Sequence, residues 1–278
     1  MADLTKHFET TKHAIDSGEI VQSPRPYLGM SQIGHPCERL LWYSFNWYYK
    51  DVIPKRISRL FLRGHREEEV VIDLLREAGI ECGDFQVEFI DIEGHFKGHC
   101  DGTAINIPEA PKTKHILEIK TMNDANFKTL IKSGSVEKTK PEYYAQAQMY
   151  MHYGKLTRTL FIAVNKNTDE LYAERIHYDS VHATQLVLKA KSVILAESPP
   201  DRMAEKTYYM CRWCSAKTVC HYEGTPERNC RTCLFSEPST DGTWLCEYQL
   251  TTNCIVDGVV IPLEIQRVGC THYQRDEV

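Results

Sequence analysis

The chain has 278 residues, of which 42% are hydrophobic and 26% are charged, and this composition suits one large globular domain with an appendage or two small domains. A formal charge of −5 at pH 7 excludes a uniformly basic nucleic-acid coat, so contacts with nucleic acid need local basic patches or bound cations. Because no run approaches the roughly 18 apolar residues of a membrane span, and MADLTKHFETTKH lacks the apolar core of a signal peptide, we expect a soluble, cytoplasmic protein.

The expected elements follow from the spacing of apolar residues. In chain order they are a buried helix (37–49), a long helix (58–78), three strands (84–92, 95–107 and 115–121), two helices (123–134 and 141–153), a hairpin of two strands (159–178) and an amphipathic helix (180–196). The apolar stripe of the long helix is expected at Leu60, Phe61, Val71, Leu74, Leu75 and Ala78. This order of elements indicates a mixed α/β layer fold.

The third expected strand, HILEIKT, carries two charged residues among apolar ones. Glu118 and Lys120 are two apart, so they project from the same face of the strand. An isolated pair of this kind is usually a surface salt bridge, but Asp101 stands seventeen residues earlier at the end of another strand, between Gly98 and Gly102. Two neighbouring carboxylates suit a hard cation such as Mg²⁺, and a lysine beside them can orient or deprotonate a water molecule.

Two helices carry polar side chains that suit the same site. Glu68 shares a face of the long helix with Gly64, and that face should pack on the sheet. Gln146 and Tyr150 are four apart and share one face of a later helix.

The motifs Gly64…Glu68, Gly98-His99-Cys100-Asp101, Glu118-Ile119-Lys120 and Gln146…Tyr150 follow one another in the order of the PD-(D/E)XK nuclease superfamily. The match resembles most its RecB-type and phage recombination exonuclease branches, and it spans about residues 30 to 222. The usual proline before the aspartate is absent, and Cys100 takes its place. The resemblance implies a restriction-endonuclease-like core, in which helices flank a central mixed sheet.

The resemblance also implies roles for the strand residues. Asp101 and Glu118 would bind Mg²⁺ or Mn²⁺, with the carbonyl group of Ile119 as a third ligand. Lys120 would position the attacking water molecule. One or two such ions can supply what hydrolysis of a phosphodiester requires, and the chain has no ATP-binding GxxxxGK[ST] loop.

The helix residues receive roles by the same resemblance. Glu68 would bind the metal directly or through water, with His65 as an alternative first-helix residue. Gln146 would help to hold the nucleophile or the DNA backbone, and Tyr150 would be its helical partner.

Eight of the eleven cysteines lie between residues 211 and 270. Cys211, Cys214 and Cys220 have the spacing C-x2-C-x5-C and need a fourth ligand, which His221 or another cysteine would supply in a zinc knuckle. The stretch CERLLWY, which begins at Cys37, resembles the first cluster cysteine of iron–sulfur RecB-type nucleases. The resemblance therefore implies a structural 4Fe–4S cluster held by these three cysteines and Cys37.

The last cysteines suggest a zinc site. Four thiolates suit a tetrahedral Zn²⁺ ion, and the expected ligands are Cys230, Cys233, Cys246 and Cys270. Cys254 and His272 remain alternatives, whereas Cys82 and Cys100 are expected as small buried hydrophobes. The expected parts of the chain are an N-terminal helical segment with the first cluster cysteine (1–54), the nuclease core (55–200), a cluster-binding segment (201–225) and a zinc-binding tail (226–278).

Two basic runs flank the expected site: Lys55, Arg56, Arg59, Arg63 and Arg66, and Lys128, Lys132, Lys138 and Lys140. Either run binds DNA phosphates or is a solvated helix face. The aromatic residues between Trp42 and Tyr49 are expected in the core, with base stacking as the alternative.

The function expected from these features is a metal-dependent deoxyribonuclease, an exonuclease encoded by a phage and acting in DNA recombination or end processing in a bacterial cytoplasm. Besides DNA, a single-strand annealing or replication protein is a candidate partner. The alternatives are a structure-specific or single-strand endonuclease and a non-catalytic nucleic-acid-binding protein with a vestigial site. Polarity, strand preference and oligomeric state stay open.

Overall fold

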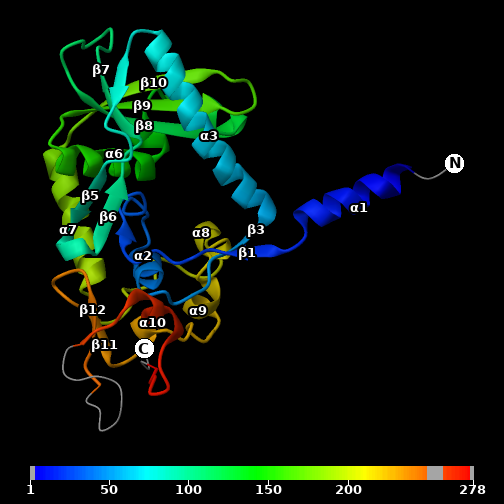
Figure 1. Cartoon of the computed structure of the whole chain (residues 1–278), viewed down its shortest axis with the longest axis vertical. Helices are drawn as coiled ribbons and strands as arrows, with labels where there is room; N and C mark the ends of the chain where they lie inside the picture. The colour runs from blue at the N-terminus through cyan, green and yellow to red at the C-terminus, as the bar shows by residue number, and fades with distance from the viewer. Residues whose placement is uncertain (1–3, 249–258, 276–278) are drawn as a thin grey trace.

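The computed structural model describes residues 4–248 and 259–275. Its body is a five-stranded mixed sheet in the order β10-β9-β8-β7-β4 (Figure 1). The strands are β4 (Glu81–Gly83), β7 (Gly102–Ile105), β8 (His115–Met122), β9 (Arg158–Asn165) and β10 (Leu171–His177). β8 and β9 are parallel, and the other neighbours are antiparallel. The fold is therefore a mixed α/β fold, and β8 is its middle strand.

Helices cover both faces of this sheet, as the alternation in β8 requires. On one face α3 (Lys55–Glu77) packs Val71 and Leu75 against Leu117 and Ile119. On the other face Ile116 belongs to the core that includes α6 (Pro141–Gly154) and α7 (Ser180–Ile194). Two shorter helices, α4 (Asp124–Ser133) and α5 (Val136–Thr139), connect β8 to α6.

The expected strand 95–107 is wrong as a single element. It is divided into β6 (Phe96–His99) and β7, which belong to different sheets; β6 pairs with β2 (Leu28–Gly29) and β5 (Glu88–Asp91). The break falls at Cys100 and Asp101. The Asp101 side chain accepts a hydrogen bond from the Ile119 backbone N–H, 2.7 Å away, so it takes up a backbone group of β8 at the point where β7 begins to pair.

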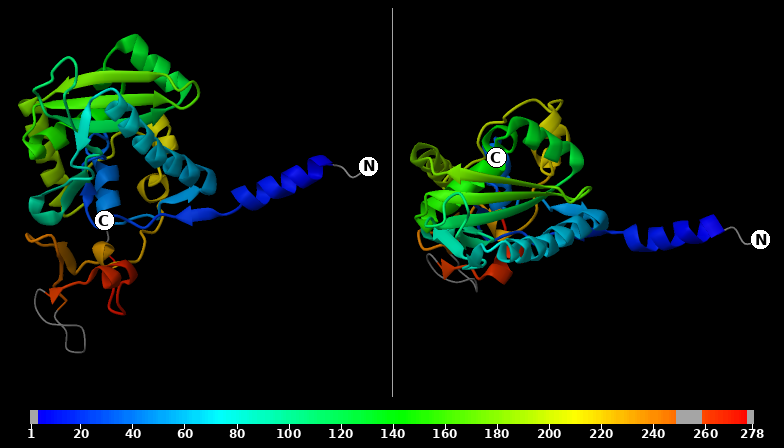
Figure 2. Two further views of the ribbon diagram at one scale, coloured as in Figure 1. Left: turned by 45° about the horizontal axis from the view of Figure 1, so that its top comes forward. Right: turned by 90° about the horizontal axis from the view of Figure 1, so that it is seen from above.

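The N-terminal segment and the tail lie side by side below the body (Figure 1). The N-terminal segment contains α1 (Leu4–Asp16), β1 (Glu19–Val21), α2 (Glu38–Phe45) and β3 (Val52–Pro54). Residues 201–225 contain α8 (Tyr209–Arg212) and α9 (Lys217–His221). The tail (226–278) contains a 3-10 turn at Cys230–Thr232, β11 (Ser236–Pro238), β12 (Trp244–Cys246), β13 (Val259–Val260) and α10 (Leu263–Val268), and a second 3-10 turn lies in the body at Ile92–Gly94. α1 projects away from the rest of the molecule in every view (Figure 2).

Arg231 joins the tail to the N-terminal segment. Its side chain is buried, and its guanidinium lies 3.9 Å from the ring centre of Trp47 and 4.5 Å from that of Trp244. It donates hydrogen bonds to the carbonyl oxygens of Phe45, at 2.9 Å, and Pro26, at 3.0 Å. The two ends of the chain therefore share one core.

The predicted burial of apolar residues is confirmed in α2 and only partly in α3. Trp42, Tyr43 and Tyr48 are buried, which confirms the expected core position of the aromatic run. In α3, however, Phe61 and Leu74 are exposed, at 55% and 46%. Within the described residues, no helix is long and apolar enough to cross a membrane.

The Arg231 contact predicts a large effect on stability. We expect Arg231→Met to lower the free energy of unfolding by about 2–4 kcal/mol, because methionine fills the volume but leaves the buried carbonyl groups of Phe45 and Pro26 without donors. Urea unfolding followed by circular dichroism measures this change. The matched control is Arg212→Met, at an exposed arginine, which should change stability by no more than about 0.5 kcal/mol. Equal stabilities for the two variants would contradict the role of Arg231.

Candidate active site

The centre of the candidate site is the carboxyl group of Glu118, whose side chain is 0% exposed in the middle strand. Oε1 forms an ion pair with Nζ of Lys120, on the same face of β8, and the Lys120 side chain is 23% exposed. Within the described part of the chain, neither carboxyl oxygen of Glu118 accepts a hydrogen bond of normal geometry. Oε2 of Glu118 is therefore a buried acceptor without a partner among the described residues.

Burial raises the pKa of Glu118 to about 8, and the nearby charges of Asp101 and Glu68 act in the same direction against the opposing effect of Lys120. Burial alone would lower the pKa of Lys120, but the carboxylates of Glu118 and Asp101 outweigh it and raise that pKa. The lysine thus stays protonated while it faces the acids. A cluster with this surplus of negative charge favours binding of a cation.

Asp101 joins this cluster from the start of β7. Burial raises its pKa, whereas Lys120 and the hydrogen bond from the Ile119 N–H lower it. The side chain of Ile119 lies in the apolar core on the opposite face, so only its backbone faces Asp101. The break between β6 and β7 is what brings Asp101 beside β8.

Glu68 approaches the cluster from α3. Burial raises its pKa, and the charge of Asp101 adds to that effect, while His65 and Lys120 lower it. Nδ1 of the exposed His65 lies 3.4 Å from Oε1 of Glu68. The structure therefore brings together Glu68, Asp101, Glu118 and Lys120, and it places His65 at the edge as a partner of Glu68.

The helix α6 closes the other side of the site. Nε2 of Gln146 donates a hydrogen bond to the hydroxyl group of Tyr150, 3.1 Å away, and both side chains are buried. Burial raises the pKa of Tyr150, and the charge of Glu118 adds to this effect, so Tyr150 stays protonated beside the acids. A side-chain carbon at Gly98 would lie 2.7 Å from the Tyr150 ring, which explains why the chain needs a glycine there.

Sequence reasoning missed Tyr143, which also belongs to this site. Its ring centre lies 5.6 Å from Nζ of Lys120, so the ring covers the ammonium group. The position of Tyr143 in α6, three residues before Gln146, was a weak signal among the many aromatic residues of the chain.

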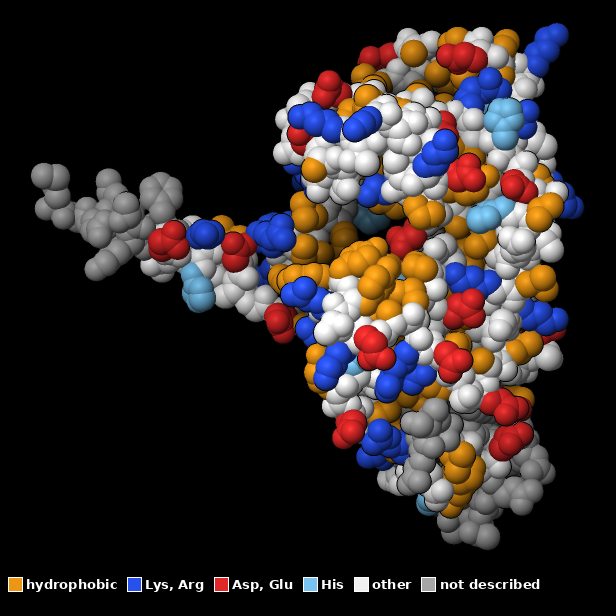
Figure 3. Space-filling view, turned by 180° about the vertical axis from the view of Figure 1, so that it is seen from behind, with side chains coloured by type: hydrophobic (Ala, Val, Ile, Leu, Met, Phe, Trp, Pro, Cys, Tyr) orange, Lys and Arg blue, Asp and Glu red, His pale blue; other side chains and the backbone are white. Residues whose placement is uncertain are grey.

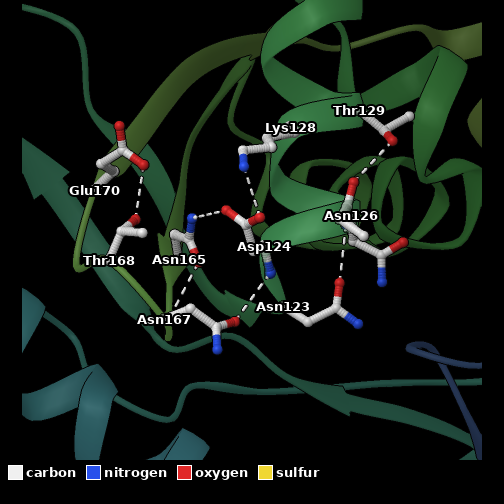
Figure 4. Close-up of polar contacts among 10 residues, drawn as sticks. Asn123, Asp124, Asn126, Lys128, Thr129, Asn165, Asn167, Thr168 and Glu170 are labelled. Atoms are coloured by element: carbon white, nitrogen blue, oxygen red, sulfur yellow. Dashed lines mark hydrogen bonds and ion pairs between the residues drawn. The ribbon is translucent and has the colours of Figure 1, made fainter.

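A polar network holds the strand end beyond the site (Figure 4). The Asn123 side chain accepts a hydrogen bond from the Asn126 N–H and so caps α4 directly after β8. Asp124 accepts a hydrogen bond from Asn165 of β9 at 3.1 Å and forms an ion pair with Lys128 at 2.8 Å. Lys128 is therefore part of this network, which favours a solvated helix face over a DNA-binding role at that position of the basic run.

The cysteines expected to hold an iron–sulfur cluster come close together. Cys37, Cys211, Cys214 and Cys220 line one small cavity. Burial raises the pKa of Cys211, and the nearby charges of Cys37 and Cys220 add to this effect. Residues from the two ends of the chain therefore meet here.

The cysteines of the expected zinc site also lie near one another. Burial raises the pKa of Cys230 to about 12, with smaller contributions from Cys270, Cys233 and Cys246. The alternative ligand His272 stacks its ring on Tyr248, with centres 5.2 Å apart, and Cys254 lies outside the described residues. In the part of the chain that the structure describes, no three His, Cys, Asp or Glu side chains already have the arrangement of a metal site.

Comparisons with known proteins give structural neighbours at low similarity. No family model and no curated protein matches the chain. An alkaline exonuclease from Laribacter hongkongensis is 17% identical, with a TM-score of 0.44 over 61% of this chain and 87% of the other. The protein SSO0001 is 18% identical, with a TM-score of 0.43 over 80% of this chain and 95% of the other.

A phage-related exonuclease from Haemophilus somnus 129PT is 15% identical, with a TM-score of 0.32 over 46% of this chain and 66% of the other. At these TM-scores the likeness carries no argument about function. The functional reading therefore rests on the residues of the site.

The raised pKa of Glu118 predicts a pH dependence of stability in metal-free protein. Between the ordinary glutamate pKa of 4.5 and about 8, the folded protein holds a proton that the unfolded chain has lost, so stability should fall as pH rises. Glu118→Gln removes this titration. In a chelator at pH 9 we expect the variant to be more stable than the native protein by about 2–4 kcal/mol, with no difference below pH 4.

Urea unfolding at a series of pH values measures this effect. The matched control is Glu69→Gln, at an exposed acid one position along α3 from Glu68, which should leave the pH profile unchanged. A Glu118→Gln profile that runs parallel to the native one would show that Glu118 titrates normally.

Proposed function

We propose that the protein is a metal-dependent deoxyribonuclease that hydrolyses phosphodiester bonds, and that it acts as an exonuclease in DNA recombination or end processing. The observation that carries the proposal is the fully buried Glu118 beside Asp101 and Lys120, where a carboxyl oxygen lacks a hydrogen-bond partner among the described residues. A plain surface salt bridge would not place its acid at 0% exposure.

The donor set fits a hard divalent cation. Asp101, Glu118 and Glu68 would hold Mg²⁺ or Mn²⁺, and the unused oxygen of Glu118 is a ready ligand. When bound, the ion supplies charge that neutralises phosphate oxygens and makes a water molecule more acidic.

The chain's own residues then position the reactants. Lys120 stays protonated, so its role is to donate a hydrogen bond that orients the attacking water or a phosphate oxygen, while the Tyr143 ring limits where its ammonium group can lie. Gln146 can donate one amide hydrogen to Tyr150 and the other to the substrate. Before DNA binds, the ion pair between Lys120 and Glu118 holds the Glu118 side chain in place.

Two further metal centres belong to the proposal. The convergence of Cys37 with Cys211, Cys214 and Cys220 supports a structural 4Fe–4S cluster. The mutual proximity of Cys230, Cys233, Cys246 and Cys270 supports a zinc ion in the tail.

The test of the nuclease proposal is a Lys120→Ala variant. It should cut DNA slower by about two to four orders of magnitude, because the group that orients the water is lost, while folding and DNA binding stay nearly unchanged. Asp101→Ala and Glu118→Ala should in addition weaken Mn²⁺ binding in calorimetry. The matched control is Lys112→Ala, an exposed lysine in another loop, which should cut at the native rate.

The assay uses end-labelled linear DNA and closed circular DNA, each single- and double-stranded, with Mg²⁺ or Mn²⁺. Cleavage of linear forms alone supports an exonuclease, whereas cleavage of circles indicates an endonuclease. Full activity of Lys120→Ala, or no metal-dependent cleavage by the native protein, would refute the proposal.

The cluster proposal predicts a brown protein. Anaerobically purified protein should carry one 4Fe–4S cluster per chain, with its broad visible absorbance, and Cys37→Ala should lose that colour and be less stable. The control Cys82→Ala, at a cysteine that does not line this cavity, should remain brown. A colourless native protein that holds only zinc, prepared with iron supplied and oxygen excluded, would contradict the cluster.

A further inference from the structure

A cavity apart from the carboxylate site and from the cysteine-lined cavity lies between the N-terminal segment, the start of α3 and the tail. Its volume is about 420 Å³, within the usual range for pockets that hold small ligands. On the opposite face, seen from behind in Figure 3, the surface is hollowed beside the point where the N-terminal helix leaves the body, and hydrophobic side chains gather below that hollow.

Basic side chains outnumber acidic ones in the lining of this cavity, which contains three arginines and Lys50 against Asp51 and Glu227. Within the described residues, Arg25, Arg228 and Arg267 form no ion pair with a carboxylate, and Nη2 of Arg228 donates a hydrogen bond to the Cys270 carbonyl oxygen, 2.6 Å away. Lys50 lines it too, paired with Glu227 at 3.0 Å. Three arginines without acidic partners around one cavity are suited to an anion, and a guanidinium binds phosphate with two parallel hydrogen bonds.

An exposed aromatic side chain stands at the same cavity. Phe61 lines it, is 55% exposed and projects from α3. Half-buried Tyr49 is a second aromatic residue in the lining. An apolar ring left in water beside cationic groups is the arrangement by which proteins stack an unpaired base and hold its phosphate.

The helix α3 connects this cavity to the carboxylate site. Phe61 precedes Glu68 by seven residues, close to two helical turns, so both side chains lie on one face of α3 about 10 Å apart along the axis. Gly64 lies between them on that face, and a side-chain carbon there would lie 3.8 Å from Thr121 of β8. This face of α3 therefore connects the cavity to the proposed metal ligands. The distance along the helix corresponds to about three nucleotides of one DNA strand.

We propose that this cavity binds an unpaired nucleotide of the DNA substrate about three nucleotides from the bond that is cut, with its base against Phe61 and its phosphate near Arg25, Arg228 and Arg267. The inference rests on the proposed nuclease function and deepens it, because a base can stack on Phe61 only if it is unpaired. The substrate class is therefore DNA with a single-stranded segment at the site.

The test measures binding of fluorescent single-stranded oligodeoxynucleotides to Asp101→Asn protein, which binds without cutting. In this background we expect Phe61→Ala to weaken binding roughly 5- to 100-fold through loss of stacking. Arg267→Gln should reduce the slope of log K against log salt by about 0.7, because one phosphate contact is lost. The matched controls are Leu62→Ala, the exposed next residue of α3, and Lys191→Gln, on α7, which should bind as the background protein does.

An oligonucleotide series with one abasic position identifies the base. The loss caused by Phe61→Ala should disappear when the missing base is about three nucleotides from the cut, and it should persist for abasic positions elsewhere. Equal binding by Phe61→Ala and Leu62→Ala would overturn the inference. Displacement of the DNA by an acidic peptide of equal charge, unaffected by Phe61→Ala, would also overturn it, because it would show a protein-binding site.

Failure of this inference is distinguishable from failure of the nuclease proposal. Native protein that cuts DNA while Phe61→Ala binds and cuts normally refutes the cavity alone. Native protein that never cuts, but binds oligonucleotides through Phe61, refutes the nuclease proposal and leaves the cavity as a single-strand binding site.

Discussion

The structure depends on one unfavourable arrangement, a carboxyl group held out of water in the middle of a sheet. Burial favours the protonated form of Glu118, and Lys120 opposes this effect only in part, so a bound cation would be needed to keep the group charged at neutral pH. The surrounding elements place their functional side chains near Glu118. Asp101 lies at the break between β6 and β7, Glu68 lies on α3, and Tyr143 of α6 covers Lys120. A scaffold that keeps such a group buried is organised around the site more than around its own stability.

The second organising feature is the meeting of the two chain ends. Cys37 from the N-terminal segment joins the cysteines that follow the body, and Arg231 from the tail enters the aromatic core of α2. The cavity that contains Arg25 and Arg267 exists only where these segments meet. The ends of the chain thus build surfaces beside the body that neither end contains alone.

Local pattern predicted α2, α3, α4, α6, α7, the hairpin and the strand HILEIKT, because apolar spacing reports directly which face is buried, but it did not predict α1 or the short helices. The break at Cys100 and Asp101 was not predictable, since FKGHCDGTAI continues to alternate, while β6 and β7 pair with different strands and Asp101 accepts a hydrogen bond from Ile119, eighteen residues later. Exposure of Phe61 was missed for a related reason: α3 extends beyond the sheet, so at Phe61 its apolar stripe faces a cavity instead of the core. Spacing predicted which of the described cysteines lie near one another, but it does not specify which ion, if any, they bind.

The Arg231 contact has a consequence for how the protein is made. Its partners at Pro26 and Phe45 are 205 and 186 residues earlier in the chain. At ribosomal rates of about 5–20 residues per second, the N-terminal aromatic residues wait roughly 10–40 s before the arginine that completes their core is synthesised. During that interval a run of tryptophan and tyrosine side chains lacks its final cover, which is the kind of surface that chaperones bind. The interval before Arg231 is synthesised is therefore one in which these aromatic side chains are open to aggregation.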